Sequence, residues 1–245
     1  MASFLNHVAS GALTGLLFAL IAMCFVIIYR AARVFNFAQG EIVVVGGFLV
    51  WTLMSSLDLP WWIAVPGALA ASLLLGLAIE RVILRPLVGE ELFAFVMVTI
   101  GLLIFIRGVV LVAWGPEVRF FPAVLPMEAI RLGPLVLDRA LVIGGGITLV
   151  VAAVASWFFN HTQSGLAMSA VAEDHQTALS LGISVKRSIA IAWGLSGVLS
   201  TVAAIVFLNG KGMTFLASDI GLSALPVALL AGLEAIGGVV AGGLI

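Results

Sequence analysis

A short polar cluster interrupts an otherwise apolar part of the chain, in the segment ARVFNFAQGEIVVVGGF (residues 32–48). Asn36, Gln39 and Glu41 lie between two long apolar runs. Side-chain amides and the free N–H groups of a helix start can bind a polar solute, and polar side chains inside a bilayer are costly. Asn36, Gln39 and Gly40 would share one face of a helix. One interpretation is therefore a helix start in a protein interior or water-filled cavity, where it lines a path for a solute.

The same cluster also fits an ordinary helix cap. Asn36 is a favoured N-cap residue, and Gln39 three positions later can complete a capping box. Glu41 in the first turn suits the positive end of the helix dipole. Both interpretations can hold together, since a cap can also line a path.

A second polar cluster lies in residues 160–187 (NHTQSGLAMSAVAEDHQTALSLGISVKR). Ser164 is a predicted N-cap and Gly182 a predicted C-terminal glycine of one helix. Small alanines lie between them and would let the backbone of another protein approach closely, while Glu173 and Asp174 offer polar contacts at a rim. The alternative is a solvated connector helix with an ordinary charged face.

The remaining reactive residues form no catalytic or metal-binding pattern. His7, His161 and His175 are scattered without the spacing of metal ligands. The string NGKGMT lacks the first glycine of a nucleotide-binding loop, because Ile205 stands at that position. We therefore expect no enzyme activity and no cofactor or metal bound by this chain.

Two charged residues lie within apolar stretches. Arg107 is seven residues from Trp114, about 10 Å at 1.5 Å per residue, so it can snorkel to the surface or form an internal ion pair. We favour these two roles over contact with a solute. Glu234 can be an ion-pair partner or a helix-end charge, and the sequence does not decide between them.

Composition indicates a membrane protein built of helices. The 245 residues are 63% hydrophobic and 9% charged, with a mean hydropathy of +1.28. A soluble domain of this length could not bury that much apolar surface. The long unbroken apolar runs exclude the alternating pattern of a membrane β-barrel. A net charge of −1 provides no basic field for nucleic acid.

The apolar runs divide one transmembrane domain, residues 1–245, into predicted spans. These are residues 8–29, 38–57, 61–79, 92–114, 139–159 and 188–208, and a region at 218–245 broken by Pro226, Glu234 and glycines. Six basic residues in alternate loops against four in the others predict an external N-terminus and a cytosolic location for residues 160–187. The chain ends inside an apolar run, so we expect a truncated C-terminus and seven or eight spans in the intact protein.

Three segments resemble the permease subunits of branched-chain amino acid ABC transporters, of the smaller-permease type. ARVFNFAQGEIVVVGGF is similar to the INFAHGE-type signature of that family. AEDHQTALSLGI resembles its cytoplasmic coupling segment, and AGLEAIGGVVAGGLI resembles its late glycine-rich region. The three occur in the family's order, and the resemblance covers nearly the whole chain.

This resemblance implies an all-α polytopic permease of the bacterial inner membrane, with a coupling helix and discontinuous or half-length helices. Its expected partners are a second homologous permease, two cytoplasmic ATPases that use ATP, a periplasmic amino-acid-binding protein and membrane lipid. The predicted pathway residues are Asn36, Phe37, Gln39, Gly40 and Glu41. The predicted ATPase-coupling residues are Gly165, Ala172, Glu173, Asp174, Ala178, Gly182 and Ile183, and we call the stretch that holds them, residues 160–187, the coupling segment.

Departures from the family pattern keep other solutes open. Gln39 stands where many members carry histidine, and Glu234 where a small residue is usual. One alternative is the same kind of permease for urea or short amides. A second is an ion-coupled carrier working alone, which would need acidic residues within the spans. A third is a passive channel, which would need no contact with an ATPase.

Overall fold

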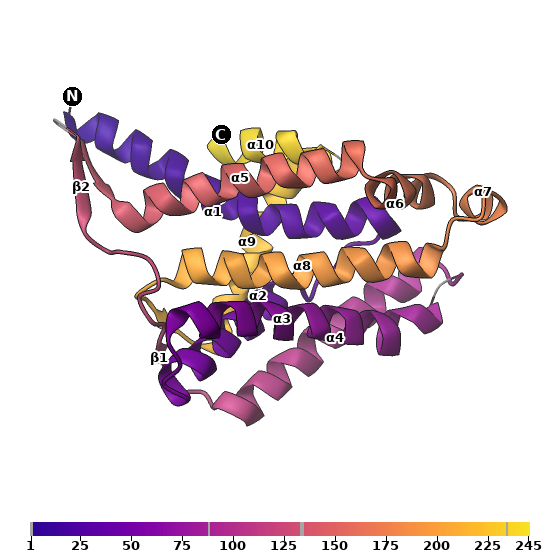
Figure 1. Cartoon of the computed structure of the whole chain (residues 1–245), viewed down its shortest axis with the longest axis horizontal. Helices are drawn as coiled ribbons and strands as arrows, with labels where there is room; N and C mark the ends of the chain where they lie inside the picture. Colours follow the sequence, from indigo (N-terminus) through magenta and orange to yellow (C-terminus); the bar gives the residue numbers. More distant parts are fainter. Residues whose placement is uncertain (1, 88, 133–134, 234) are drawn as a thin grey trace.

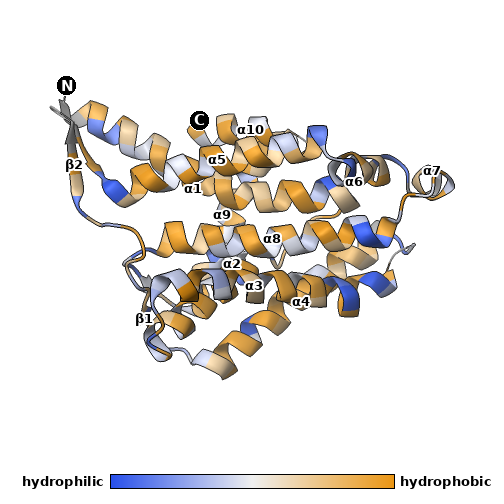
Figure 2. Ribbon diagram, in the orientation of Figure 1, coloured by the Kyte–Doolittle hydropathy of each residue, from blue (hydrophilic) through white to orange (hydrophobic). Residues whose placement is uncertain are grey.

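The computed structural model describes residues 2–87, 89–132, 135–233 and 235–245, so Glu234 lies outside the described residues. Long helices lie side by side along one axis, with short strands at one end and short helices at the other (Figure 1). Six helices in the described ranges are long and apolar enough to cross a membrane. Hydrophilic residues gather mainly towards the two ends of these helices (Figure 2). This is the distribution that a bilayer requires of a bundle that spans it.

The elements follow the predicted spans closely. The α-helices are α1 (Ala2–Ala32), α2 (Gln39–Trp51), α3 (Trp61–Ile79), α4 (Leu92–Trp114), α5 (Arg139–His161), α6 (Gln163–Glu173), α7 (His175–Ser180), α8 (Val185–Leu208), α9 (Asp219–Leu230) and α10 (Ile236–Leu244). The π- and 3-10 turns are η1 (Thr52–Ser56), η2 (Glu80–Leu84), η3 (Arg85–Leu87) and η4 (Phe215–Ser218). The strands are β1 (Arg119–Phe120), β2 (Ala129–Leu132), β3 (Leu135–Asp138) and β4 (Gly212–Met213).

Helices α1 and α8 form the centre of the bundle. In each, 67% of the most apolar window is buried, against 22–28% in α3, α4 and α5. Helix α1 packs against α5, α8, α9 and α10, and α8 packs against α2 and α3. The outer helices keep large apolar side chains on their surfaces, because lipid solvates these as well as a protein core does.

Small residues allow the closest of these contacts. A Cβ atom on Gly76 of α3 would collide with the backbone of Trp193 in α8, and one on Gly197 would collide with the backbone of Ser72. The hydroxyl groups of Ser72 and Thr201 hydrogen bond across the same interface. Helices in membranes associate through this kind of close approach and interhelical hydrogen bonding.

The polar stretch after α4 folds back on the bundle through short strands. Strands β2 and β3 form an antiparallel hairpin, and β1 pairs with β4, which follows α8. The side chain of Asn209 completes the link: its Oδ1 accepts from the Leu125 N–H at 2.8 Å, and its Nδ2 donates to the Leu125 carbonyl at 3.1 Å. These contacts hold the end of the bundle where α4 ends and α5 begins.

The broken region after η4 differs from its prediction in one respect. Pro226 was expected to interrupt it, but Pro226 lies inside α9. The helix ends instead at Leu230, and Gly232, two residues later, has a φ of +72° in the left-handed region. Backbone bonds from Gly232 N to Leu229 O and from Leu233 N to Ala228 O close a glycine-type helix end. A proline removes one backbone donor, a loss that packed membrane helices tolerate.

Candidate solute pathway and coupling segment

Helix α2 begins inside the bundle, after an elbow that we define as residues 33–38. The elbow opens at Arg33, which has the left-handed φ of 53° that non-glycine residues rarely adopt. The predicted cap at Asn36 is wrong. Ala38 is the N-cap residue and makes no side-chain cap bond. Asn36 Oδ1 instead accepts from the Ala38 N–H at 3.1 Å, a local turn that tightens the elbow before the helix starts.

The two elbow amides belong to a neutral cluster of Asn36, Gln39, Ser196 and Ser200. Asn36 Nδ2 donates to Gln39 Oε1 at 3.1 Å, and Gln39 Nε2 donates to Ser200 Oγ at 2.7 Å. Ser196 Oγ donates to Gln39 Oε1 at 3.1 Å. All four side chains are at most 1% exposed. The cluster therefore fastens the start of α2 to the middle of α8, and Gln39 does not form the predicted capping box.

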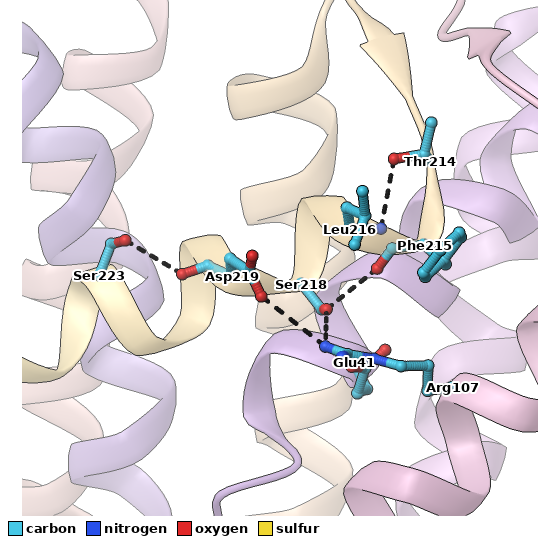
Figure 3. Close-up of polar contacts among 8 residues, drawn as sticks. All are labelled: Glu41, Arg107, Thr214, Phe215, Leu216, Ser218, Asp219 and Ser223. Carbon is cyan, nitrogen blue, oxygen red and sulfur yellow. Dashed lines mark hydrogen bonds and ion pairs between the residues drawn. The ribbon is translucent and has the colours of Figure 1, made fainter.

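A charged cluster of Glu41, Arg107, Ser218 and Asp219 (Figure 3) includes Glu41, which follows Gln39 of the neutral cluster by two residues on α2. Glu41 Oε1 accepts from Arg107 Nε at 2.8 Å and lies 2.7 Å from Arg107 Nη2. The same Nη2 donates to Ser218 Oγ at 2.8 Å and lies 3.7 Å from Asp219 Oδ1. Of the two favoured roles for Arg107, the structure has the internal ion pair. Sequence reasoning missed Ser218 and Asp219, because no local pattern links them to Glu41.

Two helix starts meet at this charged cluster. A Cβ atom on Gly40 would collide with the backbone of Ser218, and one on Gly221 would collide with the backbone of Gly40. Glycine at both positions therefore lets the start of α2 touch the start of α9. The positive ends of two helix dipoles face the same small volume, which stabilises the carboxylates of Glu41 and Asp219 there.

The junction lies near the middle of the bundle's depth. Trp114 Nε1 donates to Thr52 Oγ1 at 2.8 Å at the end of the bundle where α4 and α2 finish. Glu41 precedes Thr52 by eleven residues, about 16 Å along a helix, and the hydrocarbon core is about 30 Å thick. The ion pair therefore lies at a depth where lipid could not solvate it.

The charged cluster is incompletely satisfied. Glu41 is 1% exposed, yet its Oε2 atom has no hydrogen-bond partner in the described ranges. The side chains of Arg107 and Asp219 are 34% and 70% exposed. The cluster thus has a closed side at Glu41 and an open side at Asp219.

The coupling segment folds as two helices, and the prediction of one continuous helix is wrong. Helix α6 is capped by Thr162, whose Oγ1 accepts from the Gly165 N–H at 3.0 Å, so Ser164 is not the cap. The break falls at Asp174, whose backbone is extended. Asp174 Oδ1 then accepts from the Thr177 N–H at 3.1 Å and starts α7. Gly182 has a φ of +78° and ends α7 as predicted.

The predicted coupling residues divide by exposure. Gly165, Ala172 and Ala178 are buried against the bundle, and Ile183 is partly buried. Glu173, Asp174 and Gly182 are exposed. Sequence reasoning missed Leu179 and Leu181, which are 60% and 73% exposed on the same segment. Large apolar residues within a polar loop are the signal that could have identified them.

Arginines at the end of α1 hold the coupling segment. Arg30 Nη2 donates to Ser169 Oγ at 3.1 Å, and its guanidinium lies 4.3 Å from the centre of the Phe159 ring. Arg33 Nε donates to the Ala172 carbonyl at 3.2 Å, and its Nη2 lies 3.3 Å from Glu173 Oε1. Helix α6 is therefore attached to the residue at which the elbow begins.

Among the described residues, no three histidine, cysteine, aspartate or glutamate side chains come close enough to hold a metal ion. The arrangement offers two linked features. One is the polar junction of helix starts deep in the bundle, and the other is the pair of short helices α6 and α7 at one end of it. Phe37, the remaining predicted pathway residue, is partly buried beside Phe35, with ring centres 6.4 Å apart.

Comparison with known proteins identifies the family of this chain. Residues 7–245 match the family described as "Branched-chain amino acid transport system / permease component". The chain is 27% identical to the high-affinity branched-chain amino acid transport system permease protein BraD of Pseudomonas aeruginosa, over 99% of this chain and 83% of that protein. It is 26% identical to the corresponding protein LivH of Escherichia coli K12, with the same coverage of each chain.

A similarity over a shorter part of the chain involves a permease whose name gives another solute. The autoinducer 2 import system permease protein LsrC of Shigella flexneri is 28% identical over 71% of this chain and 50% of that protein. No solved structure matched the chain. Since the family match covers nearly all of the sequence, the chain belongs to the family of branched-chain amino acid transport permeases, and it is a multi-pass membrane permease component, not an enzyme.

Proposed function

We propose that this chain is one permease subunit of an ATP-driven importer that carries branched-chain or related apolar amino acids across the bacterial inner membrane. A second, homologous permease, two cytoplasmic ATPases and a periplasmic binding protein would complete the machine. The names of the relatives that match along the whole chain support this solute class. This permease would bind its solute weakly, because the binding protein supplies the selectivity.

The stretch from Asn36 to Glu41 forms one wall of the translocation path in this proposal. Asn36 and Gln39 support the wall from behind through their bonds to Ser196 and Ser200. Gly40 allows the start of α9 to complete the wall. Phe37 offers a partly exposed apolar surface, and the exposed part of Arg107, paired with the buried Glu41, offers a polar one. A zwitterionic solute with an apolar side chain needs both kinds of surface.

One observation carries the proposed drive mechanism: Arg33 joins the coupling segment to the elbow. Its side chain contacts Ala172 and Glu173 in α6, and its backbone begins the turn into α2. A displacement of α6 by an ATPase would therefore reach the elbow through a single residue. A second route exists through α7 and α8, because the neutral cluster binds α8 to the start of α2.

The exposed part of the coupling segment is the proposed contact with the ATPase. Leu179 and Leu181 would enter an apolar groove, and Glu173 and Asp174 would form the polar rim. Three small buried residues let α6 and α7 pack closely on the bundle on the side away from the proposed ATPase contact: Gly165, Ala172 and Ala178.

The test is ATP-driven leucine uptake by the reconstituted importer, with urea as the competing alternative. Leu179→Ser combined with Leu181→Ser should reduce uptake and weaken co-purification of the ATPase at least tenfold, while the permease still inserts. Leu57→Ser is the matched control, because Leu57 is 59% exposed at the opposite end of the bundle. Undiminished coupling in the double variant would contradict the docking role, and uptake of urea in place of leucine would contradict the solute class.

A further inference from the structure

We propose that the charged cluster binds the zwitterionic head group of the solute. Arg107 would take the solute carboxylate, and Glu41 with Asp219 would take its ammonium group. This inference rests on the proposed function, because it assigns the solute contacts within that path. It adds residues from α4 and from the start of α9, far from the elbow in sequence.

The unpaired oxygen of Glu41 is the first observation. Both contacts of this carboxylate with Arg107 use Oε1, and Oε2 is buried without a hydrogen-bond partner in the described ranges. Leaving a buried carboxylate oxygen unpaired costs free energy, so such an atom calls for a missing donor. An ammonium group carries three donors and a positive charge, which fit this position.

The open side of the cluster is the second observation. Asp219 has a side chain that is 70% exposed, at a level about 16 Å from the Trp114 end of the bundle. A carboxylate exposed to hydrocarbon at that depth is strongly disfavoured, so this side must face water or another protein. We assign it to the water-filled path, because Arg107, which is also one-third exposed there, would offer a solute the opposite charge.

Charge balance is the third argument. One cationic and two anionic side chains face the positive ends of two helices, so both signs are already present within a few ångströms. A zwitterion brings one charge of each sign and leaves the total charge of the site unchanged. The solute would thereby replace part of the Arg107–Glu41 ion pair with equivalent contacts, and the site would release it readily when the pair closes again.

The decisive experiment separates solute binding from a purely structural ion pair. Glu41→Leu combined with Arg107→Met replaces the pair with apolar side chains, a change that buried ion pairs often tolerate without loss of folding. In the complete importer in proteoliposomes, we expect the double variant to assemble and leucine uptake to fall at least tenfold. The matched control replaces the exposed Arg139–Glu128 pair, 3.7 Å apart, with Met and Leu, and should keep uptake within twofold of the unmodified importer.

Uptake within twofold in the assembled double variant would overturn the assignment and leave the pair a structural clamp. If that variant does not assemble, Asp219→Asn serves in its place, because its exposed side chain is not needed for packing. A threefold or larger loss of uptake is then expected, and no loss would overturn the proposal. Failure of the unmodified importer to take up leucine would instead contradict the proposed function itself.

A cysteine reporter tests the chemistry of the ligand. Ser223 lies one turn beyond Asp219, is exposed, and donates to the Asp219 carbonyl at 3.0 Å. The native Cys24 is buried, so Ser223→Cys provides a reactive thiol with little background. Leucine should slow its alkylation by a water-soluble maleimide at least twofold, whereas 4-methylpentanoate and 3-methylbutylamine, each lacking one charge, should not. Equal protection by either analogue, no protection by leucine, or an unreactive cysteine would overturn the proposal.

Discussion

The neutral and charged clusters begin two residues apart on α2 but differ in almost every physical respect. Both the oxygen and the nitrogen of the Gln39 amide form hydrogen bonds to neighbouring side chains, and the whole neutral cluster is buried. Glu41 shares one oxygen with Arg107, leaves the other unpaired, and opens through Asp219 to the exterior of the chain. A fully satisfied polar network makes a core rigid, whereas a partly satisfied one costs stability. The difference is consistent with our proposal that the first cluster holds the junction together and the second binds the solute.

The strongest test of this comparison removes the contact that places the clusters side by side. Gly40→Leu would drive a side chain into the backbone of Ser218 and separate the starts of α2 and α9. Overpacking of this kind costs about 1–3 kcal/mol or more, and here the obstacle is backbone that cannot rotate away. We expect little folded permease, measured as membrane yield and thermal stability of the purified complex. Gly101→Ala on α4, where nothing lies within 4 Å, should be tolerated; equal behaviour of the two variants would refute the close junction.

Breaking the charged cluster from one side should be the next largest effect. Arg107→Met alone leaves Glu41 as a buried carboxylate without its cation. We expect a loss of about 3 kcal/mol in stability, the low end for a broken buried pair, because the Arg107 side chain is 34% exposed. Thermal unfolding followed by the fluorescence of the six tryptophans can measure it. Adding Glu41→Leu should restore most of that stability, and a double variant as unstable as the single one would argue against an isolated ion pair.

Breaking the neutral cluster should cost stability and transport in parallel. Gln39→Leu leaves Asn36 Nδ2 without its acceptor and removes one of the two bonds of each serine hydroxyl, because Ser200 Oγ still donates to the Ser196 carbonyl and Ser196 Oγ to the Cys24 carbonyl. Each unsatisfied group costs about 1–3 kcal/mol, in part offset by the added apolar surface. Leucine uptake should fall only as far as the amount of folded protein falls. Lost uptake in a fully stable Gln39→Leu permease would mean that this amide also contacts the solute.

The smallest effect is expected where an ion pair is open to water. Arg33 and Glu173 lie 3.3 Å apart, with side chains 35% and 78% exposed. Such pairs contribute about 0–1 kcal/mol. Glu173→Gln should therefore leave thermal stability unchanged, and any loss of ATP-driven uptake would reflect coupling instead of folding. A marked drop in stability would show that this pair, unlike the charged cluster, is mainly structural.

The features that could be predicted are those that depend on residues adjacent in the sequence. Apolar runs located the six long helices to within a few residues, except that α1 extends back to Ala2. The elbow at Asn36 and the glycine end at Gly182 follow from local backbone preferences. The break at Asp174 was missed because good helix formers on both sides hide a single extended residue that has a side-chain cap of its own.

Contacts between distant residues could not be predicted in this way. Gln39 and Ser200 are 161 positions apart, and Glu41 and Arg107 are 66 apart. Nothing near Ser218 or Asp219 marks them as neighbours of the elbow, and one sequence carries no record of which helices pack together. The cap at Asn36 was mistaken for a local reason: its Oδ1 accepts from the Ala38 N–H two residues later, and the helix starts only after Ala38.

By itself, the sequence determined that this is a helical membrane permease of one family, with a polar elbow and a polar segment at residues 160–187. These properties depend on hydropathy, local backbone preference and short motifs, all of which are local. Only the tertiary structure decided which polar groups are satisfied and which remain open. That decision depends on how α4, α8 and α9 pack around the start of α2, since desolvation and charge pairing are properties of neighbours in space.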